Sequence, residues 1–123
     1  MKLKGKDKLA TIFTKIINKE IPADIVYETD DVLAFKDIDP KAPVHILIIP
    51  KKVEIAKVTD IKGKEHAGLL GEMFDAANKI AKDMGISEDG FRLVINCGSK
   101  AGQAVFHLHM HLLGGREMNW PPG

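Results

Sequence analysis

Apolar residues recur with two different periods along this chain, and the period indicates which segments form helices and which form strands. Residues 9–20 place apolar side chains three or four positions apart before Pro22, which predicts a short helix. Residues 64–84 keep that spacing for longer and stop before Gly85, which predicts a second helix. The apolar positions of the two helices are Leu9, Ile12, Phe13, Ile16, Ile17, Leu69, Leu70, Met73, Phe74, Ala77, Ile80, Ala81 and Met84.

Five other segments are rich in β-branched and aromatic residues and are bounded by turn residues, as is typical of strands. They are residues 24–29, 31–38, 44–50, 91–97 and 104–113. The first three are joined by short connections, which favour antiparallel pairing. The long helix falls between the third and the fourth. The sequence therefore predicts the α+β class, with both helices packed on one face of a mainly antiparallel sheet.

Length and composition favour a single cytoplasmic domain spanning residues 1–123. The net charge is +1, from 18 basic and 17 acidic residues, so neither a nucleic acid nor a membrane surface is expected as a partner. Residues 1–8 hold four lysines and one aspartate and are expected to be a flexible basic tail. The single cysteine, Cys97, excludes an internal disulfide and favours a reducing compartment.

Three of the five histidines alternate with apolar residues in the last predicted strand. Because residues i, i+2 and i+4 of a strand share a face, His107, His109 and His111 are expected to point to one side. The apolar residues between them are expected to pack against the helices; they are Phe106, Leu108, Met110 and Leu112.

Three interpretations of this histidine row remain open. The imidazoles could be ordinary residues of a half-buried strand. They could bind a metal, but neighbours on one face are about 6.6 Å apart and the outer pair about 13 Å. Zinc–nitrogen bonds are only about 2.0–2.1 Å long, so two of them would need a third ligand such as His45.

Phosphate chemistry is the third interpretation, because a neutral imidazole is a nucleophile near physiological pH. The loop at 98–103 contains two glycines, and these allow main-chain amides to approach an anion closely. The loop lacks the GxxxxGK[ST] pattern of a P-loop. Its position directly before the three histidines strengthens the phosphate interpretation.

Several stretches together resemble a known family. They are "TIFTKIINKEIPADIVYE", "LAFKDIDPKAPVHILIIPKK", "GQAVFHLHMHLLGGR" and the terminal "WPPG". The run "HLHMHLL" fits the His-x-His-x-His pattern of the histidine triad (HIT) family, and the wider match, from Thr11 to Gly123, is similar to its Hint branch of nucleotide-binding proteins. The resemblance implies a HIT-like fold with five strands and two helices, and a homodimer whose sheets join across the interface.

The resemblance also implies an activity, the hydrolysis of purine nucleoside phosphoramidates without a cofactor or metal. By this likeness His109 attacks the α-phosphorus and is transiently nucleotidylated. His111 contacts the phosphate, His107 orients the network, and His45 is a further active-site histidine. The purine nucleotide and a second copy of the chain are the expected partners.

The nucleotide site is implied residue by residue in the same way. Asp37 would accept hydrogen bonds from the ribose, and Trp120 in the C-terminal tail, residues 116–123, would reach the partner subunit's site. Ile38 would lie beside Asp37. The base and phosphate contacts would come from Ile12, Phe13, Ile16, Phe35, Leu47, Asn96, Gly102, Gln103 and Ala104, together with His109 and His111.

Two positions depart from the family pattern. Close members often have serine where Ala104 stands, so assistance to the leaving group must come from His111, a main-chain amide or water. Many carry histidine where Val53 stands. Two alternative functions stay open: hydrolysis of dinucleoside polyphosphates, and a nucleotide-binding regulatory or scaffold role with incidental catalysis. A zinc-binding module is disfavoured by the ligand spacing. The leaving amine, the choice between adenine and guanine, and any protein partners are not determined by the sequence.

Overall fold

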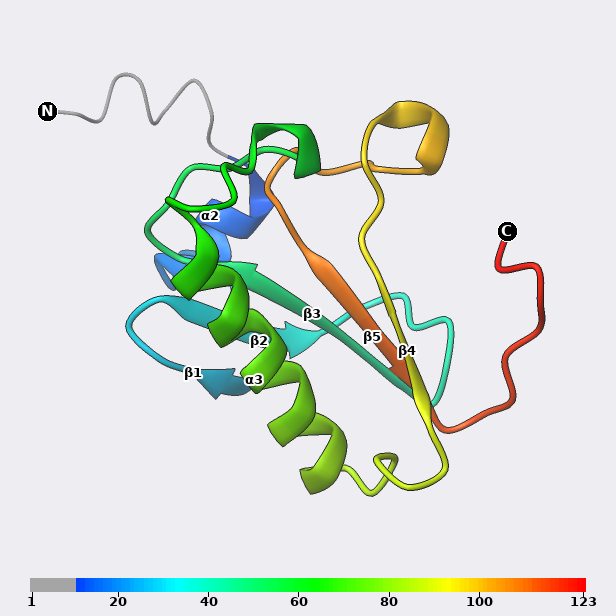
Figure 1. Cartoon of the computed structure of the whole chain (residues 1–123). Coiled ribbons are helices and arrows are strands. Elements are labelled where there is room, and N and C mark those ends of the chain that lie inside the picture. Colours follow the sequence, from blue (N-terminus) through cyan, green and yellow to red (C-terminus); the bar gives the residue numbers. More distant parts are fainter. Residues whose placement is uncertain (1–10) are drawn as a thin grey trace, which may run out of the picture.

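A single five-stranded antiparallel sheet organises the chain, of which the computed structural model describes residues 11–123. The strand order is β1-β2-β3-β5-β4, so β3 and β5 lie side by side near the centre of the sheet (Figure 1). This confirms the predicted sheet. The strands are β1 (Ile25–Glu28), β2 (Val32–Lys36), β3 (Val44–Pro50), β4 (Phe91–Val94) and β5 (Met110–Gly114).

Two α-helices accompany the sheet in residues 11–123, and both are shorter than the apolar periodicity predicts. Helix α2 spans Ile12–Ile17; the Thr11 hydroxyl caps it by accepting the amide hydrogen of Phe13. It stops early because Lys19 adopts a left-handed φ of 63°, which a helix cannot continue through. Residues 1–10, including the predicted basic tail and Leu9, lie outside the described part of the chain.

Helix α3 spans Ala67–Asp83, and the four residues before it form a turn. In this turn the His66 ring accepts from the Lys62 amide, and the His66 amide donates to the Lys62 carbonyl. It lies across one face of the sheet (Figure 1). No helix in residues 11–123 is long and apolar enough to cross a membrane. Short 3₁₀ turns, η1 (Val58–Asp60) and η2 (Ser99–Ala101), occupy two of the connections.

The main core fills the space between α3 and the sheet. Alternate residues of the central strands point into it, as the period of two requires. Its buried members include Val32, Ala34, Ile46, Ile48, Met73, Ala76, Ala77, Ile80, Leu108, Met110 and Leu112. The prediction that Leu108, Met110 and Leu112 pack against a helix is confirmed.

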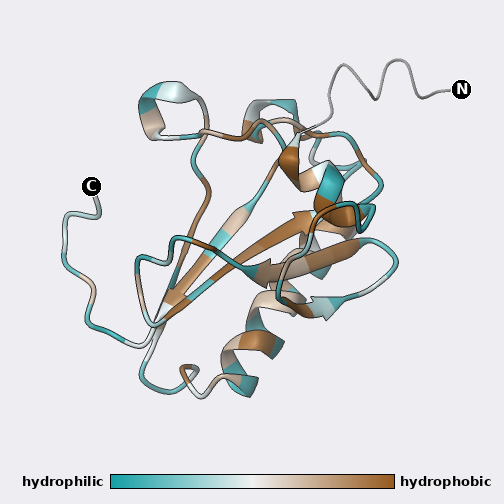
Figure 2. Cartoon of the chain, turned by 180° about the vertical axis from the view of Figure 1, so that it is seen from behind, coloured by the Kyte–Doolittle hydropathy of each residue, from teal (hydrophilic) through white to brown (hydrophobic). Residues whose placement is uncertain are grey.

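A second, smaller core lies on the opposite face, where Phe13 and Ile16 of α2 meet the sheet. The strand residues in it are Leu33, Phe35, Leu47 and Ile49. Figure 2 shows the sheet from this side. The prediction that both helices share one face is therefore wrong. Helix α2 is only six residues long and buries two side chains, so it covers part of its face and leaves the rest for polar groups.

The predicted strand at 104–113 is also wrong in its first half, since β5 begins only at Met110. The neighbouring strand β3 ends at Pro50, and Met110 already pairs with Ile48. Beyond that point the chain is held by other contacts: the Leu108 amide donates to the Ile55 carbonyl at 2.8 Å. Phe106 consequently lies outside the core, with 45% of its surface exposed.

Candidate active site

Four histidines gather on the face of the sheet that α2 only partly covers. His45 comes from β3 and His111 from β5, while His107 and His109 precede β5. The rings form a connected row, with centroids 5.2 Å apart for His45 and His111 and 5.0 Å apart for His109 and His111. The edge of Phe13 meets the His109 ring at 5.1 Å and closes the end of the row. The structure therefore brings together all four histidines singled out in the sequence.

The main chain fixes which nitrogen of His109 carries its proton. Nδ1 of His109 lies 2.7 Å from the carbonyl oxygen of His107. A carbonyl can only accept, so Nδ1 bears the hydrogen and Nε2 of neutral His109 keeps an unshared electron pair. Within residues 11–123 no buried side-chain nitrogen or oxygen lacks a partner, yet Nε2 has none; it is therefore reachable from the surface of that part of the chain. His109 is presented as a nucleophile.

His107 is held from a different direction. Its Nε2 lies 2.9 Å from the Pro50 carbonyl and donates to it. Burial lowers the pKa of His107 below its usual value, which favours the neutral ring. The main-chain carbonyl of His107 thus meets Nδ1 of His109, and the orienting role that the resemblance implies for His107 stays a prediction.

An amide sets the protonation of His45. The Lys41 amide donates to Nδ1 of His45 at 3.0 Å, so Nδ1 carries no hydrogen and the proton of the neutral ring is on Nε2. Burial lowers the pKa of His45, which keeps the ring neutral. Nε2 of His45 lies 2.9 Å from Nδ1 of His111 and is the donor of that hydrogen bond.

His111 consequently has the tautomer opposite to that of His109. Its Nδ1 accepts from His45, so its own hydrogen is on Nε2. Burial, with smaller contributions from His109 and His45, lowers the pKa of His111 to about 4. In its neutral form His109 therefore offers an electron pair on Nε2, beside His111, whose Nε2 carries a hydrogen.

Comparison with known proteins identifies the family to which this chain belongs. The HIT domain family matches residues 18–118. The chain belongs to the HIT family. It is 56% identical over 108 residues to the purine nucleoside phosphoramidase of Escherichia coli, covering 88% of this chain and 89% of that protein. It is 51% identical to the 14 kDa zinc-binding protein of Zea mays, covering 98% and 94% of the two chains.

A solved structure agrees in fold as well as in sequence. The HIT family hydrolase from Legionella pneumophila Philadelphia 1 superposes with a TM-score of 0.89 at 50% identity, covering 93% of this chain and all of that one. These relatives confirm the resemblance to the Hint branch of the HIT family that the sequence motifs indicated.

One group of side chains in this HIT domain has the composition of a metal site. Asp37, His45 and His111 offer ligand atoms that all lie within 4.8 Å of one another. The tautomers do not fit a metal, however. A cation on Nε2 of His45 would drive the proton to Nδ1, where it would face the Lys41 amide hydrogen, donor against donor. The cluster is arranged for hydrogen bonding, and the 3.4 Å contact of Asp37 with neutral His45 belongs to it.

The loop before the triad is built around Gln103 rather than around a free side chain. Gln103 is buried; its Oε1 accepts from the Gly98 amide, and its Nε2 donates to the carbonyls of Ala56 and Val105. Gly98 and Gly102 have φ values of 90° and 94°, which residues with a side chain rarely adopt. A Cβ built on Gly102 would lie 4.0 Å from Nδ2 of Asn96, so those two predicted phosphate contacts are neighbours.

The predicted apolar residues of the nucleotide site divide into two groups. Four are buried together in the smaller core: Phe13, Ile16, Phe35 and Leu47. The other two present apolar surface to solvent, with Ile12 exposed by 50% and Ile38 by 95%. Ala104 is exposed at the end of the loop.

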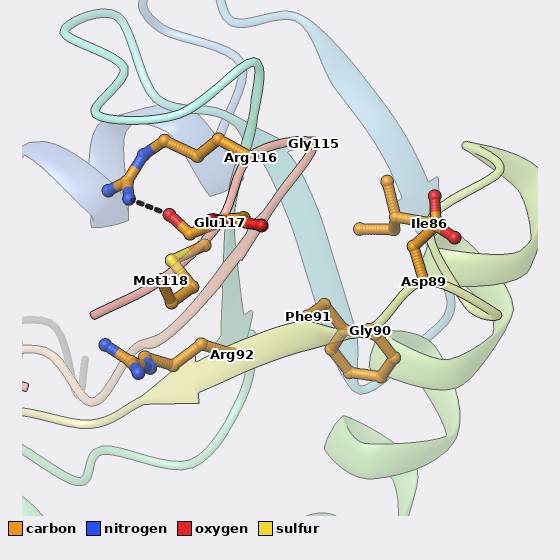
Figure 3. Close-up of a pocket in the computed structure, with 9 residues that line it drawn as sticks. All are labelled: Ile86, Asp89, Gly90, Phe91, Arg92, Gly115, Arg116, Glu117 and Met118. Carbon is orange, nitrogen blue, oxygen red and sulfur yellow. Dashed lines mark hydrogen bonds between the residues drawn. The ribbon is translucent and has the colours of Figure 1, made fainter. Parts of the chain in front are cut away.

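Trp120 lies elsewhere in this HIT domain. Its side chain is 81% exposed, and the C-terminal tail lies on the β4 side of the sheet (Figure 1). The tail is attached where Arg92 donates to the carbonyl of Asn119 at 3.0 Å. Beside it is a cleft of about 700 Å³. It is lined by Ile86, Asp89, Gly90, Phe91, Arg92, Gly115, Arg116, Glu117 and Met118 (Figure 3).

Sequence reasoning missed the main-chain groups that set the tautomers. They are the carbonyls of Pro50 and His107 and the amide of Lys41. Any residue type supplies such groups, so no pattern of side chains points to them. The one signal was indirect: Lys41 and Pro50 both lie in the stretch "LAFKDIDPKAPVHILIIPKK" that carried the resemblance.

Proposed function

We propose that this protein hydrolyses purine nucleoside phosphoramidates, such as AMP joined through nitrogen to an amine, by way of a nucleotidyl-histidine on His109. The opposite tautomers of His109 and His111 are the observation that carries the proposal. The name of the Escherichia coli relative, purine nucleoside phosphoramidase, supports the same activity.

In the first step the electron pair on Nε2 of His109 attacks the α-phosphorus. A nitrogen–phosphorus bond to His109 forms while the phosphorus–nitrogen bond to the amine breaks. In the second step water attacks the same phosphorus, the bond to His109 breaks, and AMP leaves while the proton from water goes to solvent. The Nδ1–H bond to the His107 carbonyl holds the ring in the reactive orientation in both steps.

His111 acts as a hydrogen-bond donor to the phosphoryl oxygens. With a pKa of about 4 it is neutral near pH 7, and a neutral imidazole does not give up its remaining proton there. The departing amine therefore takes its proton from water. Ala104 cannot supply a hydroxyl for this step, so departure of the amine depends on solvent access at the end of the 98–103 loop.

Binding of the nucleotide is assigned to groups around this centre. Exposed Ile12 and Ile38 are the surfaces available to the purine, with the buried cluster around Phe13 beneath them. Asp37 accepts hydrogen bonds from the ribose, alongside the Asp39 amide that donates to its Oδ1 and the Nε2 of His45 that lies 3.4 Å from its Oδ2. Asn96 and the amides around Gly102, Gln103 and Ala104 hold the phosphate.

The working unit is a homodimer in the cytoplasm, by the same proposal. In the described chain β4 pairs with β5 only, which leaves an edge available to a second copy. The adjacent cleft and the exposed Trp120 would then be covered by the partner, and the tail would approach the partner subunit's site. Sedimentation equilibrium tests this part: a monomer at micromolar concentration would contradict it.

The decisive experiment measures AMP release from an adenosine phosphoramidate carrying a fluorescent amine, with EDTA present throughout. We expect release by the wild-type protein and a loss of at least about 1,000-fold in His109→Ala, because the nucleophile is gone. Nucleotide affinity, measured by calorimetry with AMP, should be nearly unchanged. Lys79→Ala is the matched surface control, since Lys79 is an exposed residue of α3 that pairs with Asp83 one turn away.

Other outcomes separate the competing functions. AMP binding without release, followed by activity in Ala104→Ser, would show a regulatory binding protein that lacks leaving-group assistance. Release of AMP from a dinucleoside polyphosphate but not from the phosphoramidate would show that the protein is a dinucleoside polyphosphate hydrolase. Loss of wild-type activity in EDTA, restored by zinc, would overturn the metal-free mechanism.

A further inference from the structure

Arg116, two residues beyond β5, ties the end of that strand to the loop between β2 and β3. Its Nε donates to the Lys41 carbonyl at 3.0 Å, and its Nη1 donates to the Glu117 carbonyl at the same distance. Figure 3 shows the guanidinium and its bond to Glu117 at the rim of the cleft. Arg116 is the only residue in positions 11–123 whose side chain donates to the Lys41 main chain.

The turn that aims Arg116 at this loop is tightly built. Gly115 has a φ of 88°, and a Cβ on it would lie 2.9 Å from Cβ of Pro43. Contact this close is possible only without a side chain at position 115. The turn after β5 is therefore pressed against the loop that precedes His45.

Lys41 is the point where this contact meets the catalytic network. Its carbonyl accepts from Arg116, and its amide donates to Nδ1 of His45. The Lys41 side chain is engaged separately, in an exposed contact with Asp39. The orientation of the Lys41 main chain therefore decides whether Nδ1 of His45 meets a donor.

We propose that Arg116 is a positioning residue, which fixes through the Lys41 main chain the nitrogen that carries the proton in His45 and, in turn, in His111. The chain of contacts is continuous: Arg116 to Lys41, Lys41 to His45 at 3.0 Å, and His45 to His111 at 2.9 Å. When Lys41 turns away, Nδ1 of His45 can take the proton, and Nε2 then accepts from His111. His111 would lose the N–H that it offers to the phosphoryl group.

A simpler role for Arg116 would be to anchor the C-terminal tail through Glu117. Arg92 provides the matched control for that role. It also holds the tail by donating to a main-chain carbonyl, but that carbonyl belongs to Asn119 in the tail and not to the 37–43 loop. An effect that depends on the tail alone should appear in both Arg92→Met and Arg116→Met.

The first test reads the tautomers directly, by long-range ¹H–¹⁵N correlation spectra of ¹⁵N-histidine-labelled protein without nucleotide. In the wild type we expect hydrogen on Nε2 of both His45 and His111. Arg116→Met should give a mixture of tautomers at both rings, and Arg92→Met and Lys41→Ala should keep the wild-type pattern, because both leave the Lys41 main chain in place. Lys41→Pro, which removes the amide itself, is the positive control.

The second test is kinetic and rests on the proposed function. Arg116→Met should lower kcat roughly tenfold, as small misplacements of catalytic groups do, while KM changes by less than about twofold. Arg116→Lys should recover part of kcat, because one ammonium can replace one of the two hydrogen bonds. Wild-type tautomers in Arg116→Met would overturn the proposal even if kcat fell, as would equal tautomer changes in Arg92→Met.

The failure of this proposal is distinguishable from failure of the proposed function. A wild-type protein that releases no AMP contradicts the phosphoramidase activity but leaves the spectra to decide the role of Arg116. If Arg116→Met does not fold, Arg116→Ala and Lys41→Pro still report on the same network. Altered tautomers in Lys41→Pro with wild-type tautomers in Arg116→Ala would show that the amide acts without the arginine.

Discussion

The two faces of the sheet are made by the same strands but are stabilised in different ways. Towards α3, the residues at alternate positions are apolar and buried, as Ile46 and Leu112 are. Towards α2, the residues next to them in sequence are His45 and His111, each with a specific hydrogen-bond partner. The face towards α3 depends on close packing. The face towards α2 depends on hydrogen bonds whose direction is set by which histidine nitrogen carries the proton.

The difference shows why so small a domain can hold four histidines at one place. A core built on one face supplies the burial that fixes the strands, so the other face is free to carry polar side chains. Helix α2 then covers that face only at one end, with Phe13 against His109. The site is partly buried, which lowers the pKa values of His45, His107 and His111 and favours their neutral rings, and partly open, which admits a substrate.

Removing a hydrogen-bond donor from the histidine face should have the largest effect. That effect should be on kcat and not on stability. His111→Ala is expected to lower kcat by about 100- to 1,000-fold, because a preorganised donor to the phosphoryl group is lost. Single-turnover kinetics with the phosphoramidate measure this. Its midpoint of urea unfolding at pH 7 should change little. A kcat within about threefold of the wild type would show that His111 has no part in the reaction.

The neighbouring residue on the other face should behave in the opposite way. Leu112→Ala removes a fully buried side chain and is expected to lower the free energy of unfolding by about 3 kcal/mol. Its kcat per folded molecule should stay within about twofold of the wild type. Urea unfolding and active-site titration separate the two quantities. A large loss of kcat in a fully folded Leu112→Ala protein would mean that the two faces are coupled.

Acid should destabilise the histidine face selectively. The pKa of His111 is about 4 in the folded protein, against 6.5 for an unperturbed histidine. Between these values the unfolded chain binds a proton that the folded protein does not, so stability falls as the pH falls. Between pH 6.5 and pH 4, the free energy of unfolding of the wild type should fall by about 2 kcal/mol more than that of His111→Ala. This figure allows for the partial solvation of His111. An equal pH dependence in both proteins would contradict the assignment.

Asp37 should have the smallest effect, on binding. Asp37→Ala is expected to raise KM about tenfold with little change in kcat, because the ribose contacts that it removes exist in both ground and transition states. Initial-rate kinetics over a range of substrate concentrations test this, with Asp39→Ala as the neighbouring acidic control. A fall in kcat without a rise in KM would instead assign Asp37 to the His45–His111 network, from which it lies 3.4 Å away.

Much of the fold could be predicted from periodicity, and the errors have common causes. The five strands and the long helix were found because alternation and helical spacing are local properties of the chain. The side of the sheet taken by α2 was not, because its apolar stripe fits either face. The start of β5 was misplaced because Pro50 ends the neighbouring strand, and a strand extends only as far as its partner.

The sequence by itself determined the family, the antiparallel sheet and the histidines on one face, since these follow from residue types at fixed spacing. Only the tertiary structure decided the chemistry of each ring. His45 and His111, like Pro50 and His107, are brought together from distant parts of the chain. Imidazole has two nitrogens and one proton when neutral, so its role depends on the partner that each nitrogen meets, and that partner exists only once the chain has folded.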